Sequence, residues 1–139
     1  MKIIECPRDA MQGIQRFIPT AKKIEYINAL LKVGFDTIDF GSFVSPKVIP
    51  QMADTWQIIE HLDTSETDTK LLAIVANLRG ARDAISYSKI NYIGFPFSIS
   101  ETFQQRNTNL SQQQAFDLVQ HTKSTNRFAG HLLYLIFVS

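Results

Sequence analysis

Short apolar runs with strand character alternate with helical stretches along this chain, and that alternation limits its possible folds more than any other feature. Five such runs occur: Ile3–Cys6, Phe35–Phe40, Leu71–Val75, Ile90–Phe95 and Leu132–Val138. Apolar strands separated by amphipathic helices are typical of a parallel sheet covered by helices. The sequence therefore predicts an α/β protein.

The segments between the strands carry four helix signals. After a turn-rich connection at Pro7–Gly13, the pattern predicts a helix capped by Thr20 and ended by Gly34, helices over Met52–Leu62 and Gly80–Tyr87, and a helix opened by the capping box Ser111–Gln114. We expect Trp56 and Phe116 to face the core and the Lys22–Lys23 pair to face solvent. We expect Cys6 to be a small buried side chain within its strand.

The predicted order β-α-β-α-β-α-β-α-β fits two architectures. One is an open doubly wound sheet and the other is part of a (β/α)8 barrel, and composition does not distinguish them. In both, functional side chains gather just past the carboxyl ends of the strands. No segment matches the glycine-rich phosphate loop of nucleotide-binding proteins, so nucleotide binding is not indicated.

The composition restricts where the protein works and what it binds. With 14 Lys and Arg against 13 Asp and Glu, a net charge of +1 creates no field that attracts nucleic acid or an acidic membrane surface. The single cysteine cannot form an internal disulfide, and the N-terminus lacks the apolar stretch of a signal peptide. We therefore expect a cytoplasmic protein that binds neither nucleic acid nor membranes.

Charged and amide side chains follow the predicted strands, where the carboxyl ends of a parallel sheet would meet. Arg8 and Asp9 follow the first strand, Asp39 ends the second and Asn77 ends the third. Two carboxylates and a guanidinium can hold a hard divalent cation and an anionic substrate. A polar residue at a strand end also commonly caps the next element, so the pattern alone leaves both interpretations open.

Four motifs in these strand-end segments resemble those of one enzyme family. They are, in order, ECPRDAMQ at Glu5–Gln12, IDFGSFVSPK followed by PQM within Ile38–Met52, NLRG at Asn77–Gly80, and SETF followed by RN within Ser100–Asn107. Each is similar to the corresponding motif of the hydroxymethylglutaryl-CoA (HMG-CoA) lyases. The match runs from Ile3 to about Asn109.

The resemblance implies the N-terminal part of a (β/α)8 TIM barrel of the metallolyase superfamily, with about five strands and four helices. Residues 1–139 would form one truncated domain of the HMG-CoA-lyase-like, pyruvate-carboxyltransferase type. Lyases of this family cleave HMG-CoA to acetyl-CoA and acetoacetate, a reaction of leucine degradation and ketone-body formation. The complete enzyme would use a divalent cation, Mg²⁺ or Mn²⁺, and an acyl-CoA substrate.

The same resemblance implies roles for individual residues. Asp9 corresponds to the metal-binding aspartate of the family, and Arg8 to the arginine that stabilises the enolate of the departing acetyl-CoA. Asp39 stands at the position of the active-site glutamate, so that Arg8 and Asp39 are the candidate catalytic residues. The candidate substrate-binding residues are Arg8, Gln12, Ser42 and Asn107.

The chain also departs from the family pattern. Ala10 replaces a glycine, which would be strained if that turn needed a positive φ, and Asp39 is one methylene shorter than glutamate. The family's two metal-binding histidines, in a His-x-His motif, and its catalytic cysteine in a glycine-rich loop have no counterpart. We therefore expect this chain to bind a divalent cation weakly or not at all, and to be inactive alone.

Two alternatives to the lyase interpretation remain at this stage. One keeps the superfamily but assigns a Claisen condensation, as in isopropylmalate and homocitrate synthases. The other is a non-catalytic half-barrel that forms a homo-oligomer or associates with another polypeptide through its open side, because five strands leave unpaired edges and an uncovered inner face.

Overall fold

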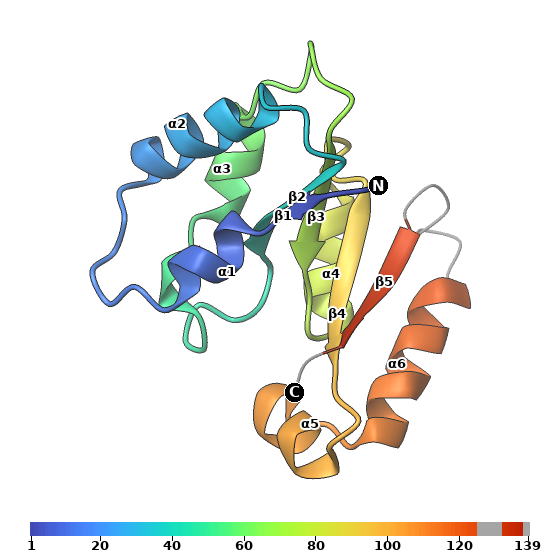
Figure 1. The fold of residues 1–139 in the computed structure, drawn as a ribbon. Helices are drawn as coiled ribbons and strands as arrows, with labels where there is room; N and C mark the ends of the chain where they lie inside the picture. The colour runs from blue at the N-terminus through green and yellow to red at the C-terminus, as the bar shows by residue number, and fades with distance from the viewer. Residues whose placement is uncertain (125–131, 138–139) are drawn as a thin grey trace.

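The structure is a computed structural model and describes residues 1–124 and 132–137. Five parallel strands form one sheet in the order β1-β2-β3-β4-β5, so each strand pairs with its neighbour in sequence. A doubly wound sheet reverses its strand order at a switch point, whereas a (β/α)8 barrel does not. The consecutive order and the curled sheet of Figure 1 confirm the prediction of a partial barrel.

The boundaries of the elements follow the predicted order, with additional helices. The strands are β1 (Ile4–Glu5), β2 (Thr37–Ser42), β3 (Lys70–Ile74), β4 (Tyr92–Phe97) and β5 (Leu132–Phe137). The helices are α1 (Pro7–Gln12), α2 (Thr20–Leu31), α3 (Thr55–His61), α4 (Leu78–Ile85), α5 (Glu101–Thr108) and α6 (Gln112–Ser124), with a 3-10 turn, η1, at Pro50–Met52. The last residue of the predicted fifth strand, Val138, lies outside the described residues.

The two-residue period of the strands separates an outer face from an inner one. Outward-facing side chains pack beneath the helices and form the core; from β2, β3 and β4 they include Ile38, Phe40, Leu71, Ala73, Ile93 and Phe95. The alternate positions line a cavity on the inner face, among them Thr37, Asp39, Leu72, Ile74, Tyr92 and Pro96. The inner face is therefore where strands can present functional groups.

Helices α2, α3, α4 and α6 cover the outer face of the sheet. Their contributions to the core are Ile27, Leu31, Ile58, Ile59, Ala81, Ala84, Ala115 and Val119. At roughly 25 cal/mol for each Å² of apolar surface removed from water, this contiguous layer is the main favourable contribution to folding. Among the described helices, none has both the length and the apolar character needed to cross a membrane.

Two helices of the structure were not predicted: α1, where a turn-rich connection was expected, and α5, in a segment for which no element was predicted. The Pro7–Gly13 segment is not a turn-rich loop but helix α1, with Pro7 in its first turn, where proline's missing N–H is no loss. Because Ala10 lies inside this helix, its replacement of glycine causes no backbone strain. The segment after β4 forms a separate helix, α5, capped by Ser100, whose hydroxyl accepts a hydrogen bond from the Phe103 N–H at 3.3 Å.

Four predictions of side-chain burial are wrong. Trp56 and Phe116 are 48% and 44% exposed, because neighbouring positions on each helix supply the buried contacts instead. Cys6 is exposed, because the strand ends at Glu5 and the chain turns into α1. Lys22 is exposed as expected, but Lys23 is fully buried, where an ion pair with Asp54 compensates its charge.

The two ends predicted for the first long helix have different outcomes. Thr20 is not the N-cap; Pro19 holds that position, and the Thr20 hydroxyl donates to Asp54 at 2.8 Å. Gly34 adopts a φ of 86°, the left-handed conformation that favours glycine after a helix, and so confirms its predicted role.

Candidate functional site

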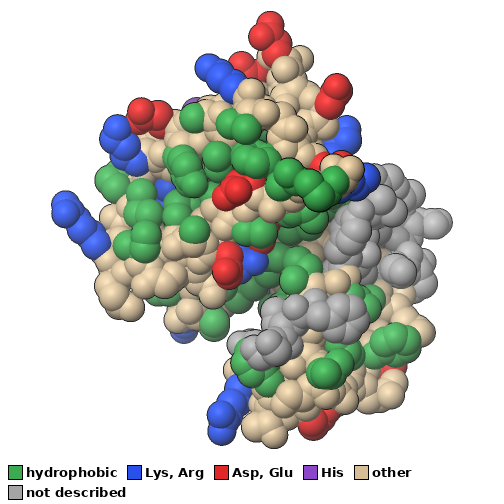
Figure 2. Space-filling model, viewed as in Figure 1, with side chains coloured by type: hydrophobic (Ala, Val, Ile, Leu, Met, Phe, Trp, Pro, Cys, Tyr) green, Lys and Arg blue, Asp and Glu red, His purple; other side chains and the backbone are tan. Residues whose placement is uncertain are grey.

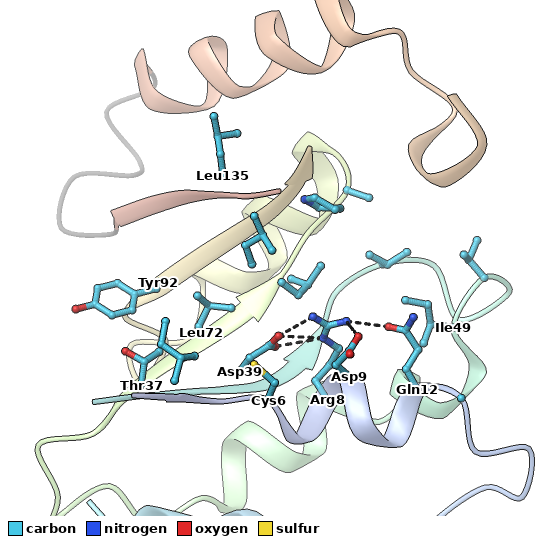
Figure 3. Close-up of a pocket in the computed structure, with 18 of the residues that line it drawn as sticks. Cys6, Arg8, Asp9, Gln12, Thr37, Asp39, Ile49, Leu72, Tyr92 and Leu135 are labelled. Carbon is cyan, nitrogen blue, oxygen red and sulfur yellow. Dashed lines mark hydrogen bonds and ion pairs between the residues drawn. The ribbon is translucent and has the colours of Figure 1, made fainter. Parts of the chain in front are cut away.

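Helix α1 places a guanidinium between two carboxylates at the carboxyl end of the half-barrel. Arg8 Nη2 and Nε donate to Asp39 Oδ2 at 2.6 and 3.1 Å, so a residue of α1 is joined to the neighbouring strand β2. Arg8 Nη1 donates to Asp9 Oδ1 at 3.1 Å and to Gln12 Oε1 at 3.0 Å (Figure 3). Four of the predicted site residues are thus in direct contact.

Burial and charge act in opposite directions on Asp39. This carboxylate is 3% exposed on the inner face of β2. Desolvation raises the pKa of Asp39 above its usual 3.8, and the hydrogen bonds and positive charge of Arg8 only partly offset that effect. Asp9 is exposed and adds a smaller repulsion that raises the same pKa. A buried carboxyl with a raised pKa is suited to proton transfer.

The Arg8 cluster lies at the rim of a cavity of about 1170 Å³ on the inner face of the sheet. Its walls come from the inner-face positions of the strands, from the segments at their carboxyl ends, where a TIM-barrel active site lies, and from Lys2 and Asp36 at their amino ends. Apolar side chains of this wall include Ile4, Val44, Val48, Ile49, Leu72, Ile74, Phe103 and Leu135. Figure 2 shows apolar side chains gathered on this face around acidic ones. The site combines one charged cluster with a largely apolar wall.

Among the remaining candidates, Ser42 and Asn77 form hydrogen bonds with backbone groups outside this cluster. The Ser42 hydroxyl is buried, donates to the Ile74 carbonyl at 3.4 Å and accepts from the Val44 N–H at 3.2 Å, so it is engaged with backbone. Asn107 belongs to α5, but its side chain is not among those described. Asn77 caps α4 by accepting from the Gly80 N–H at 2.9 Å, which is the capping role left open by the sequence.

Sequence reasoning missed a cysteine and several strand residues that line the cavity. Cys6 lies beside Asp39 in Figure 3, between β1 and α1. Although Cys6 is exposed, desolvation by neighbouring groups and the negative charge of Asp39 raise the pKa of its thiol, which favours the protonated thiol over a nucleophilic thiolate. Thr37 and Tyr92 also line the cavity; the alternation of their strands was the available signal.

The described residues do not fit a complete divalent-cation site. Nowhere in residues 1–124 and 132–137 do three or more His, Cys, Asp and Glu side chains gather at metal-binding distances. Asp9, the predicted ligand, contacts Arg8, and Asp39 is bound to the same guanidinium. A hard cation takes about six oxygen ligands, of which this chain offers only a few at the rim of the cavity.

Comparison with known proteins shows which proteins this chain resembles. No family model matches the chain. It is 33% identical over 116 residues to the mitochondrial hydroxymethylglutaryl-CoA lyase of Arabidopsis thaliana, a match that covers 83% of this chain and 24% of the relative. It is also 33% identical over 111 residues to the 3-hydroxy-3-isohexenylglutaryl-CoA/hydroxymethylglutaryl-CoA lyase of Pseudomonas aeruginosa, covering 80% of this chain and 36% of that enzyme.

Solved structures of HMG-CoA lyases are also similar to this chain. The HMG-CoA lyase of Bacillus subtilis superposes with a TM-score of 0.90 at 29% identity, over 98% of this chain and 45% of the other. That of Acinetobacter baumannii, in complex with coenzyme A and 3-methylmalate, gives a TM-score of 0.89 at 28% identity, over 98% and 44%. The chain spans less than half the length of these relatives.

Fold and site together define a class: part of a (β/α)8 enzyme barrel with an arginine–carboxylate cluster at the carboxyl ends of its strands. Within that class, the chain is HMG-CoA-lyase-like and corresponds to the N-terminal part of the lyase barrel. The family resemblance inferred from the four sequence motifs is confirmed.

Proposed function

We propose that this chain supplies the N-terminal half of the active site of an HMG-CoA-lyase-type enzyme, which cleaves a 3-hydroxy-3-methylglutaryl thioester to acetyl-CoA and acetoacetate. The observation that carries the proposal is the Arg8–Asp39 pair, with Nη2 and Oδ2 2.6 Å apart, at the rim of a cavity of about 1170 Å³. The lyases with which the chain superposes support it, one of them holding coenzyme A.

The reaction is a retro-aldol cleavage. The tertiary hydroxyl loses its proton, the bond between the carbinol carbon and the thioester's methylene breaks, and the electron pair forms the enolate of acetyl-CoA, which is then protonated on carbon. Arg8 has the fixed positive charge and the N–H donors to stabilise the enolate oxygen. Asp39 orients Arg8 through three hydrogen bonds, and its raised pKa suits it to exchange a proton with the reacting groups.

We assign the rest of the cluster to substrate and cation binding in the complete enzyme. Gln12, with Ser42 and Asn107, is the proposed substrate-side set, and Asp9 is the proposed ligand of a Mg²⁺ or Mn²⁺ ion. The described residues provide too few ligands for that ion, so this chain alone is proposed to be inactive. The proposed setting is the cytoplasm, although the similar enzymes include both cytoplasmic and mitochondrial forms.

A chimera tests this function directly. The segment of the Pseudomonas aeruginosa lyase that matches this chain is replaced by residues 1–139, and release of acetyl-CoA and acetoacetate from HMG-CoA is measured with Mg²⁺ present. We expect cleavage by the chimera, and a loss of about a hundredfold or more in kcat when Arg8→Met removes the enolate-stabilising charge. A folded chimera without cleavage, or one unaffected by Arg8→Met, would contradict the proposal.

The second candidate function is a Claisen condensation on the same scaffold. It would join the methyl carbon of acetyl-CoA to the keto carbon of a 2-oxo acid, and water would then hydrolyse the thioester and release free coenzyme A. The same chimera can therefore be assayed for thiol release from acetyl-CoA in the presence of 2-oxoisovalerate. The lyase assignment ranks higher because relatives at 30% identity or more that cover most of this chain include several HMG-CoA lyases.

A further inference from the structure

Gln51 is a buried residue to which the proposed chemistry gives no role. It lies in η1, within the Pro50–Gln51–Met52 part of the second family-like motif, and is 3% exposed. Its side-chain amide forms three hydrogen bonds, one as acceptor and two as donor, all with the loop of residues 14–18. Oε1 accepts from the Ile18 N–H at 2.9 Å, and Nε2 donates to the Ile14 and Arg16 carbonyls at 3.0 and 3.1 Å.

That loop begins at the end of α1, the helix that carries Arg8, Asp9 and Gln12. The first bond from Gln51 reaches Ile14, only two residues beyond Gln12. A helix of six residues is unstable by itself, because nucleation costs more than so few hydrogen bonds return. Its orientation therefore depends on how its two ends are held, and Gln51 holds the loop at its C-terminal end.

A buried ion pair fixes η1, and thus Gln51, against α2. Lys23 is fully buried; its Nζ donates to the Gln51 carbonyl and to Asp54 Oδ1, the latter at 2.8 Å. Asp54 Oδ2 accepts from the Thr20 hydroxyl at 2.8 Å, and Lys23 Nζ lies 4.1 Å from the centre of the Phe17 ring. These bonds connect the loop after α1, η1 and the N-terminus of α2.

The next residue, Thr55, joins the same segment to β2. Its Oγ1 accepts from the Ser42 N–H at 3.2 Å and donates to the Met52 carbonyl at 2.8 Å. The fit at β2 is close, since a Cβ on Gly41 would lie 2.6 Å from Thr55 Cγ2. Residues 50–55 are therefore bonded on one side to the loop that follows Arg8's helix and on the other to the strand that carries Asp39.

We propose that Gln51 is a positioning residue that keeps α1 seated so that Arg8 stays bonded to Asp39. The importance given to that pair rests on the proposed function, but the positioning itself does not. The side-chain hydrogen bonds of Gln51 go to the loop 14–18 and not to Arg8 or Asp39, so Gln51 acts through that loop.

The test reads the Arg8 side chain by NMR in the 139-residue chain. Arg8 Nε–H donates to Asp39, so its resonance, assigned by its loss in Arg8→Lys, should exchange slowly with water. Gln51→Glu keeps the acceptor to Ile18 but loses both donors to the loop. The matched control is Gln104→Glu, which changes another buried glutamine in the same way, in α5. Thermal melts monitor the stability of both variants.

We expect Gln51→Glu to speed exchange of the Arg8 Nε–H by about tenfold, equivalent to roughly 1.4 kcal/mol, and Gln104→Glu to leave it unchanged. If Gln51→Glu does not fold, Thr20→Val decides, because it removes only the outermost bond of the same network and should speed exchange about threefold. The proposal would be overturned if Gln51→Glu folds and its Arg8 Nε–H exchanges at the wild-type rate, or if Gln104→Glu speeds that exchange equally. Where Gln51→Glu does not fold, an unchanged exchange rate in Thr20→Val would overturn it.

The NMR experiment and the chimera separate the two proposals. Faster exchange in Gln51→Glu together with a chimera that fails to cleave HMG-CoA would leave the positioning role standing and remove the lyase function. An active chimera together with unchanged exchange in Gln51→Glu would do the reverse.

Discussion

At the scale of single residues, the main feature is a carboxylate placed where ionisation is costly. Asp39 is almost completely buried, and the raised pKa shows that the guanidinium of Arg8 does not fully compensate the desolvation. A protein selected only for stability would place a neutral side chain there. A buried carboxyl with a raised pKa fits the proton-transfer role proposed for Asp39.

This gives a prediction for the pH dependence of stability. Because the pKa of Asp39 is higher in the folded than in the unfolded chain, the folded state binds the proton more tightly, and its stability falls as pH rises from about 3.8 through the raised pKa. Asp39→Asn, which cannot ionise and still accepts from Arg8, should raise the free energy of unfolding at pH 7 by about 1 kcal/mol. Urea denaturation at pH 4 and pH 7 measures this.

The advantage of Asp39→Asn should be larger at pH 7 than at pH 4, because more of the wild-type carboxyl carries its proton at pH 4. Asp63→Asn is the control, since hydrogen bonds from Ser65 lower the pKa of that exposed carboxyl and give it the opposite slope. An Asp39→Asn variant that loses stability at pH 7 would show that the ion pair with Arg8 outweighs desolvation.

Cation binding is a second residue-scale prediction. Calorimetric titration of this chain with Mn²⁺ or Mg²⁺ should show weak or no binding. Asp9 is exposed, Asp39 is bonded to Arg8, and the described residues contain no group of three or more His, Cys, Asp or Glu side chains that could hold a metal ion. Asp9→Asn should not change the heat measurably. Micromolar affinity that Asp9→Asn abolishes would contradict the prediction and establish a site at α1.

At the scale of secondary-structure elements, the long strongly patterned segments were predictable and the short ones were not. The Leu71–Val75 run and the helices flanking it follow directly from apolar period. Helix α1 did not, because proline followed by charged residues is equally typical of a turn, and tertiary contacts decide the outcome in so short a segment. Helix α5 has two signals in its sequence, the N-cap Ser100 and the C-cap Asn109, whose φ is 57°.

Close approach of α4 to the loop after β2 gives an element-scale prediction. A Cβ at Gly80 would lie 2.6 Å from the Phe43 carbonyl oxygen, a backbone atom that cannot turn away. Gly80→Ala should therefore lower the free energy of unfolding by about 1–3 kcal/mol, although alanine favours helix. Gly13→Ala is the matched control: nothing lies within 4 Å and its φ is −83°, so it should be neutral or slightly stabilising.

Chemical denaturation followed by circular dichroism compares the two glycine variants. Equal stability of Gly80→Ala and wild type would mean that α4 can shift away from the loop. That outcome would weaken the argument that α4 is held close to the loop after β2.

At the scale of the whole molecule, the sequence predicted a parallel α/β fold, and the family-like motifs then predicted the barrel. Strand periodicity alone could not decide between barrel and open sheet, because both give the same alternation; the consecutive strand order does so. The same limit applies to the site. The family-like motifs identified Arg8, Asp9 and Asp39 as members of one candidate site. The role of Gln51 could not be identified in this way, because it depends on contacts with a loop more than thirty residues away in sequence.

The open side of the half-barrel leads to the last prediction. Strands β1 and β5 each pair on one edge only in the described sheet, and apolar side chains face the cavity, with Ile4 54% and Val48 66% exposed. Such edges and faces associate in water. Light scattering should therefore show an average mass that rises above 15.8 kDa with concentration.

Ile136→Lys places a charge on the inner face of β5, next to Ile74 and Leu72, and should weaken self-association by about tenfold. Val33→Lys, on an exposed residue that does not line the cavity, should leave association unchanged. A mass of 15.8 kDa at every concentration would show that the half-barrel remains monomeric despite its open side. An equal effect of both lysine variants would instead place the contact elsewhere on the surface.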